Sequence, residues 1–331
     1  MTRTPEERPV MSGARRKVSF TSVDADCVAW HYPGDNGACV VMAGAIAATK
    51  EPGTDAFAAR FHDAGFTVLA FDYRHLGESG GQPRQVVRIG EQLADWNAAI
   101  DFAAELPEVD PARVAIWGHS LSGGHVLNLA AHRDDLAAAI AQSPHADGQA
   151  ISRNASRYQR PAAMLRFGGR ALLDAIGGLF GRAPLLVPLV GEPGTVAALT
   201  TPDGADMPRA LNPDDRYPDW RQTVAARSAM RTGFYRPGRY ADRIRCPLLV
   251  IACDQDHSAL TEPALRVAER APDAELVRLS GGHYSSYLAG HEPAVAAELS
   301  FLRRRVLDAA PSADDRHDER SESPRDRSPA R

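Results

Sequence analysis

The chain has 331 residues, of which 44% are hydrophobic and 24% charged, and its formal net charge is −4 at pH 7. This composition is ordinary for a globular protein and indicates neither a nucleic acid nor a membrane as a partner. The length allows one large α/β domain with an insertion, or two domains.

Both ends of the chain are polar. Residues 1–14 carry mixed charge and lack the apolar stretch that a secretion signal requires, and residues 309–331 are mostly Asp, Arg, Glu, Ser and Pro. Too few apolar side chains are present there to offset the entropy of ordering, so we expect both ends to be disordered. No stretch of the chain is apolar over the length of a membrane span, and we expect a cytoplasmic protein.

Between these ends, apolar runs of strand length alternate with segments of helical spacing. The first two runs are typical of an antiparallel pair, and the later ones are typical of buried parallel strands. The predicted strands are 18–23, 27–32, 39–43, 67–71, 114–117, 137–141, 247–252 and 276–279, and the predicted helices are 55–64, 86–104 and 294–307. This alternation predicts a parallel sheet that binds ligands at the carboxyl ends of its strands.

The alternation stops over residues 147–240, between two predicted core strands. This segment is rich in Gly, Pro and Arg, and its predicted helical pieces are short, at 162–176 and 220–230. Apolar clusters within it indicate that it packs against the rest of the protein. We therefore predict a core made of residues 15–146 and 241–308, and a cap that lies over the carboxyl edge of the sheet and sets substrate choice.

The cysteines lie mostly in or beside the apolar runs, and they form no CxxC pair and no metal-like spacing with histidine. They are Cys27, Cys39, Cys246 and Cys253. This placement predicts buried thiols in a reducing compartment rather than a disulfide framework, and it indicates no metal site.

The most specific motif joins the strand 114–117 to a helical segment. The sequence there is Gly118-His119-Ser120-Leu121-Ser122. A strand, a sharp turn with serine at its apex and a helix together make a nucleophile elbow, whose usual pattern is Gly-x-Ser-x-Gly. This chain has serine instead of glycine at the fifth position, where a small side chain allows helix and strand to pack closely. Ser120 is therefore the candidate nucleophile.

A serine hydroxyl needs a base to take its proton, and the base needs an acid to orient it. His283 follows a strand-like run and a Ser-Gly-Gly loop near the end of the fold, which makes it the candidate base. Asp254 and Asp256 both follow the buried run 247–252, and they compete for the role of the acid.

An oxyanion at the reacting carbon needs two N–H donors. The first is expected from Leu121, directly after the nucleophile, and the second from the small-residue loop 44–48. Candidate substrate contacts at the same edge of the sheet are Ala45, His119, His145 and His257.

These motifs together resemble those of the α/β-hydrolases over about residues 18–307. The segment 71–79 is similar to the family's Asp-x-Arg-Gly-x-Gly-x-Ser loop, and Gly281-Gly282-His283 is similar to its histidine loop. The strand 248–251 and the loop after it resemble the family's acid loop, in a register that implies Asp256 as the acid and Asp254 as second choice. More narrowly, the chain looks like the capped serine hydrolases grouped with dienelactone hydrolases and serine aminopeptidases.

One departure from the family concerns the loop after the strand 39–43. The family usually has His-Gly-x-Gly there, where this chain has Gly44-Ala45-Ile46-Ala47. The resemblance places the second oxyanion donor on Ile46.

The resemblance implies an α/β-hydrolase fold: a mostly parallel central sheet, helices on both faces and an inserted cap. It also implies hydrolysis of an ester, thioester or lactone of a small organic substrate through an acyl-enzyme, with no cofactor. The same three residues also suit acyl transfer, acyl elimination or cyclisation in natural-product biosynthesis. A non-catalytic binding protein is a further alternative, although such a protein has no need of a complete Ser, Asp and His set.

Overall fold

The computed structural model describes residues 15–308, so the disorder predicted for 1–14 and 309–331 lies outside the described residues. Its centre is an eight-stranded sheet in the order β1-β2-β4-β3-β5-β6-β9-β10. β1 (Arg16–Ser22) and β2 (Ala25–Tyr32) are antiparallel to their neighbours, and the other strands run parallel. The parallel strands are β3 (Cys39–Ala43), β4 (Thr67–Phe71), β5 (Val114–His119), β6 (Ala138–Gln142), β9 (Leu248–Cys253) and β10 (Ala274–Leu279).

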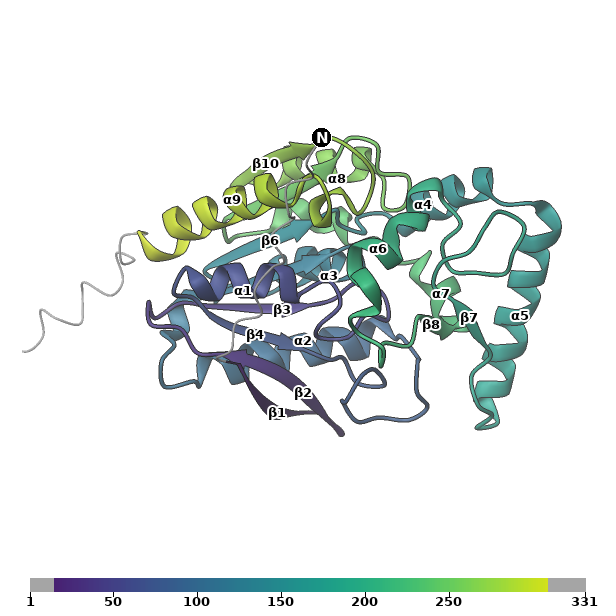
Figure 1. The fold of residues 1–331 in the computed structure, drawn as a ribbon, viewed down its shortest axis with the longest axis horizontal. Coiled ribbons are helices and arrows are strands. Elements are labelled where there is room, and N and C mark those ends of the chain that lie inside the picture. Colours follow the sequence, from purple (N-terminus) through teal and green to yellow (C-terminus); the bar gives the residue numbers. More distant parts are fainter. Residues whose placement is uncertain (1–14, 309–331) are drawn as a thin grey trace, which may run out of the picture.

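Helices cover both faces of this sheet (Figure 1). One face packs against α1 (Asp55–Asp63) and α9 (His291–Leu302), and the other against α2 (Ile89–Ala104), α3 (Leu121–Ala130) and α8 (Thr261–Arg270). Because side chains alternate along a strand, β3 contributes Val41 to one core and Met42 to the other. The predicted fold class is confirmed.

Between β6 and β9 the chain forms a separate group of elements at one end of the sheet (Figure 1). They are α4 (Gly148–Ala155), α5 (Pro161–Leu179), β7 (Leu186–Pro188), α6 (Met207–Leu211), β8 (Thr223–Ala225) and α7 (Ala226–Thr232). We call this group the cap. Within residues 15–308 no helix has the length and apolar character needed to cross a membrane.

Two sequence predictions near the cap need correction. The helix predicted over 220–230 is wrong in its first half, because β-branched residues there pair as β8 with β7, and only α7 is helical. The helix predicted from residue 86 begins at Ile89, because the backbone of Arg88 is extended, with φ −129° and ψ 117°. Before it, the backbone N–H of Val87 donates to Ser228 Oγ of the cap at 2.9 Å.

Glu298 of α9 places a carboxyl group in the apolar layer between α9 and the sheet. The side chain is fully buried, and one oxygen accepts a hydrogen bond from Trp117 Nε1 at 3.0 Å. The other oxygen has no partner among the described residues. Burial raises the pKa of Glu298 to about 8, and the hydrogen bond from Trp117 offsets only part of this rise. Near pH 7 the carboxyl is therefore mostly protonated.

Glu298→Gln is expected to make stability less dependent on pH. Between pH 4.5 and about 8 the folded chain keeps a proton on Glu298 that the unfolded chain has released, so this residue makes the free energy of unfolding fall as pH rises. The glutamine variant lacks that contribution and is more stable than the wild type by on the order of a few kcal/mol at pH ~9. Urea unfolding of both proteins at pH ~5.5 and pH ~9 measures the two slopes, and equal slopes would contradict the prediction.

Candidate active site

Ser120 occupies a strained turn between β5 and α3. Its backbone has φ 57° and ψ −117°, a region that side-chain-bearing residues rarely adopt. The Ser120 N–H donates to the carbonyl of Gln142 at 3.0 Å, and the Ser120 carbonyl accepts from the N–H of His145 at 2.8 Å. A Cβ at Gly118 would lie 2.6 Å from the backbone of Ser122, so glycine is required for this close approach. The turn is therefore held by β6 and the loop that follows it.

The structure brings Ser120, His283 and Asp256 together in one chain of hydrogen bonds. His283 Nε2 lies 2.9 Å from Ser120 Oγ, and His283 Nδ1 lies 2.8 Å from Asp256 Oδ2. His283 and Asp256 are both buried. This is the geometry in which a neutral imidazole accepts a serine proton on one nitrogen and donates to a carboxylate from the other.

The two aspartates that follow β9 have different surroundings. Besides His283, Asp256 contacts the backbone N–H groups of Ser258 and Ala259, which donate to its Oδ1 at 2.9 and 2.7 Å. Asp254 instead accepts from Arg278 Nε at 2.7 Å, at the protein surface. Only Asp256 reaches the imidazole.

The charge state of His283 is set by two opposing effects. Burial alone would lower its pKa, but the negative charge of Asp256, the hydrogen bond to Asp256 and the charge of Asp203 outweigh burial and raise the pKa above its ordinary value. Burial lowers the pKa of His145 to about 4 and that of His119 well below its ordinary value, so these two imidazoles are neutral near pH 7.

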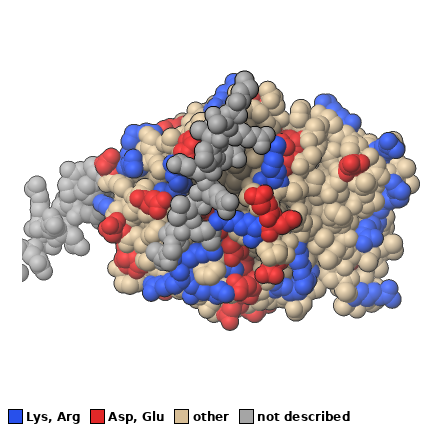
Figure 2. Space-filling view, viewed as in Figure 1, with Lys and Arg blue, Asp and Glu red and all other residues tan. Residues whose placement is uncertain are grey.

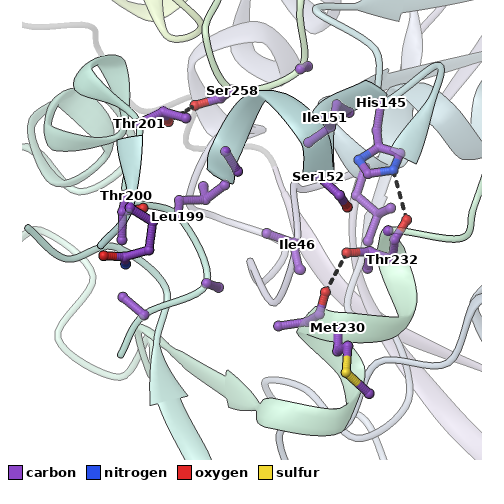
Figure 3. Close-up of a pocket in the computed structure, with 18 of the residues that line it drawn as sticks. Ile46, His145, Ile151, Ser152, Leu199, Thr200, Thr201, Met230, Thr232 and Ser258 are labelled. Carbon is purple, nitrogen blue, oxygen red and sulfur yellow. Dashed lines mark hydrogen bonds between the residues drawn. The ribbon is translucent and has the colours of Figure 1, made fainter. Parts of the chain in front are cut away.

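A cavity of about 270 Å³ opens beside Ser120 and His283. Cap residues line it, among them Ile151, Leu199 and Met230, which are labelled in Figure 3. The lining is mostly apolar, with hydroxyl groups of Ser and Thr, and no Asp, Glu, Lys or Arg of the described residues lines it. Within residues 15–308 no group of His, Cys, Asp and Glu side chains is arranged to hold a metal ion.

The two residues predicted to supply the oxyanion donors both line this cavity. Leu121 begins α3, and Ile46 lies in the loop after β3. Neither backbone N–H donates to a protein acceptor within the described residues. Both N–H groups are therefore free to bind a substrate oxygen.

The predicted substrate contacts divide into one that lines the cavity and three that do not. His145 lines it, and its Nε2–H donates to the carbonyl of Thr232 at 3.1 Å (Figure 3). His119 is fully buried, with its ring 4.7 Å from that of His283, and it is not among the residues that line the cavity. Ala45 is also buried in the core, and His257 is turned toward Tyr158, with Nδ1 3.1 Å from its hydroxyl. These two residues are likewise absent from the cavity wall.

Sequence reasoning missed the cap residues that form most of the cavity wall. Met164 and Phe167 of α5 are examples, and Thr201 lies in an irregular stretch between α5 and α6. The spacing of the α5 residues indicated only a helix, and no motif marks Thr201. Their position depends on how the cap packs, which no local pattern reports.

The family model described as "Alpha/beta hydrolase family" matches residues 51–299. The chain belongs to this family. The quorum-quenching protein AidA of Acinetobacter baumannii is 40% identical over 294 residues, which are 87% of this chain and 94% of AidA. The polyketide transferase GrgF of Penicillium sp. is 26% identical over 303 residues, which are 88% of this chain and 97% of that protein.

Solved structures of α/β-hydrolases show the same fold. The crystal structure of GrgF from Penicillium sp. sh18 superposes with a TM-score of 0.73 at 25% identity and covers 88% of this chain and 99% of that one. The structure of DcsB with its substrate analogue superposes with a TM-score of 0.74 at 20% identity, with the same coverage. The second likeness concerns the fold alone.

The two places where this chain departs from the α/β-hydrolase motifs, the elbow and the loop after β3, are in direct contact. Ser122, at the fifth position of the elbow motif, donates a hydrogen bond from its hydroxyl to the carbonyl of Gly44, where the family's His-Gly-x-Gly loop would begin. The Ser122 hydroxyl lies 2.5 Å from the hydroxyl of Tyr73, which in turn accepts from Trp96 Nε1 at 2.7 Å. This buried chain of hydrogen bonds ties α2 and the elbow to the loop that carries Ile46.

Ser122→Ala is expected to lower the free energy of unfolding by about 1–3 kcal/mol, because it leaves the buried Tyr73 hydroxyl and the Gly44 carbonyl without this partner. Urea unfolding measures the loss. Ser156→Ala is the matched control, since that hydroxyl is exposed and bonds only within its own turn, to the carbonyl of Arg153. Its expected change is within about 0.5 kcal/mol. Equal losses in the two variants would contradict the prediction.

Proposed function

We propose that this α/β-hydrolase is a serine hydrolase that cleaves an ester, thioester or lactone of a small organic molecule. The observation that carries the proposal is the hydrogen-bonded chain from Ser120 through His283 to Asp256 at the wall of the cavity, with distances of 2.9 and 2.8 Å. A buried histidine between a strained serine and a carboxylate suits a nucleophile, a general base and the acid that orients the base.

In the proposed reaction, Ser120 Oγ attacks the carbonyl carbon while His283 Nε2 takes the hydroxyl proton. Asp256 stabilises the imidazolium that forms, and the N–H groups of Leu121 and Ile46 bind the developing oxyanion. His283 then gives the proton to the leaving oxygen or sulfur, which leaves an acyl group on Ser120. A water molecule, activated by the same imidazole, releases the acid and restores the serine.

The cavity favours a neutral and largely apolar substrate. Burying an ion against a wall without an opposite charge is costly, and the described lining offers no charged side chain to pair with one. Hydroxyl groups such as those of Thr200 and Ser152 provide a few polar contacts to a carbonyl or hydroxyl of the substrate. The similarity to AidA, a quorum-quenching protein, supports a small organic signal molecule as one such substrate.

Acyl transfer is the second candidate function. Its support is the similarity to GrgF, a polyketide transferase, which extends over 88% of this chain. In that reaction an alcohol or amine replaces water in the second step, and the roles of Ser120, His283 and Asp256 are unchanged. The two functions differ only in whether the acyl product carries an oxygen from water, which mass spectrometry in ¹⁸O-labelled water measures.

Ser120→Ala is expected to abolish labelling by a fluorophosphonate probe and to reduce turnover of a short-chain aryl ester on the order of a thousandfold or more. Peptide mapping of the labelled wild type is expected to find the probe on Ser120. Ser122→Ala retains the label, because the Ser122 hydroxyl bonds to Gly44 and does not line the cavity. Label that persists in Ser120→Ala and maps to Ser122 would overturn the assignment.

Activity is expected to rise with pH as His283 loses its proton, because only the neutral imidazole accepts the serine proton. Since the pKa of His283 is raised, the midpoint of the rise in kcat/KM is expected above the ordinary value of 6.5. Asp256→Asn removes a cause of that raised pKa, so it is expected to move the rise to lower pH and to reduce the rate strongly. Asp254→Asn is the control. It is expected to leave the pH of the rise and the rate near those of the wild type, since Asp254 pairs with Arg278 at the surface. A larger loss of rate in Asp254→Asn than in Asp256→Asn would contradict the assignment of Asp256 as the acid.

A further inference from the structure

A second buried carboxylate, Asp203 of the cap, reaches the two loops that carry Asp256 and His283. It lies in the short 3-10 turn Pro202–Asp206, and its side chain is 7% exposed. Asp203 Oδ2 accepts the backbone N–H of His257 at 2.7 Å and that of His283 at 3.2 Å. Both of these donors belong to the core. His257 directly follows Asp256 in the chain, so the two donors lie on the two loops whose side chains form the hydrogen bond between Asp256 and His283.

Ser258 strengthens the link to the acid loop. Its hydroxyl donates to Asp203 Oδ1 at 2.8 Å, and its backbone N–H lies 3.2 Å from Asp203 Oδ2. The same N–H donates to Asp256 Oδ1 at 2.9 Å, so one residue contacts both carboxylates. Thr201, two residues before Asp203, lies with its hydroxyl 2.6 Å from that of Ser258, as Figure 3 shows.

Gly282, in the loop that carries His283, leaves room for the Asp203 side chain. A Cβ at Gly282 would lie 2.8 Å from Cβ of Asp203, closer than two such carbons approach in proteins. Glycine before His283 therefore allows the cap turn to sit directly against the loop. The Gly-Gly-His pattern that marked the histidine loop in the sequence thus has a local steric cause at its second glycine.

Asp203 also adds negative charge beside the imidazole. Burial alone would raise the pKa of Asp203, but the charge of His283 and the hydrogen bonds from Ser258, His257 and His283 lower it instead, so the carboxylate is ionised near pH 7. The other titratable groups that face His283 are Asp256, His119, His145 and Tyr284. Burial keeps the two histidines and the tyrosine neutral, so Asp203 and Asp256 are the two charges that act on the imidazole.

We propose that Asp203 is a positioning residue, through which the cap fixes the histidine and acid loops relative to each other and stabilises the imidazolium form of His283. This inference rests on the proposed function. A cap residue thereby influences the proposed general base. The backbone N–H of His283 donates to Asp203, and its ring bonds to Asp256. The stretch that leads into Asp203 also lines the cavity with Leu199 and Thr200, so one piece of chain contacts both substrate and the histidine loop.

Asp203→Asn tests the proposal, because the amide keeps the shape of the side chain and removes its charge. With that charge gone the imidazolium is less stable, so the rise of kcat/KM with pH is expected at lower pH than in the wild type. Looser positioning of His283 is expected to reduce kcat roughly ten- to a hundredfold, with KM changed much less. Asp203→Glu keeps the charge, so it is expected to lose rate while the rise stays at the wild-type pH.

Asp206→Asn is the matched control. Asp206 lies in the same turn, is partly exposed and pairs with Arg209 at 3.0 Å, and its loss is expected to leave the pH profile unchanged. A profile and kcat for Asp203→Asn that equal those of the wild type would overturn the inference. Failure of both Asp203 variants to fold would assign the residue a purely structural role and overturn it as well.

The same measurements separate this inference from the proposed function. A wild-type protein that neither reacts with a fluorophosphonate at Ser120 nor shows a rising pH limb contradicts the proposed function itself. A wild-type protein that does both, with an Asp203→Asn variant that behaves identically, contradicts only the role of Asp203.

Discussion

The backbone conformation of Ser120 is the constraint on which the site depends. A serine with a positive φ between a strand and a helix is unfavourable in isolation. It persists only where neighbouring structure fixes its backbone from several sides. Here the N–H and carbonyl of Ser120 bond to Gln142 and His145, which end and follow the adjacent strand β6. Parallel pairing of β5 with β6 thus determines where the hydroxyl points. In a relaxed turn the hydroxyl would not meet His283, and the donors of α3 would not face the cavity.

Much of this core could be predicted from sequence, because its signals are local. The runs Cys39–Ala43 and Thr67–Phe71 have the predicted bounds to the residue, since each is a continuous apolar stretch ended by glycine or a polar residue. Ser120 and His283 were singled out as candidates for a similar reason, as each follows a strand in a loop marked by glycine. The choice of Asp256 over Asp254 needed the family resemblance, because spacing alone does not report which carboxylate turns inward.

The cap was harder to predict because its contacts are made with distant parts of the chain. Trp220 was assigned to a helix, yet its indole N–H donates to the carbonyl of Ala47, 2.9 Å away in the loop after β3. Val87 was assigned to a helix, yet it precedes the extended Arg88, and its backbone N–H donates to Ser228 of the cap. Asp203 has no sequence signal at all, since an aspartate after proline is typical of an ordinary turn. In each case a tertiary contact overrides the local preference.

The buried cysteines have a practical consequence for work on this protein. All four thiols are buried, and burial raises their pKa values, to about 11 for Cys253 and about 12 for Cys246. Thiol reagents attack the thiolate, which these residues hardly populate at neutral pH. The folded native chain therefore behaves as a cysteine-free background. A single cysteine introduced at an exposed position such as Leu172 of α5 would accept a fluorophore selectively and place a label on the cap alone.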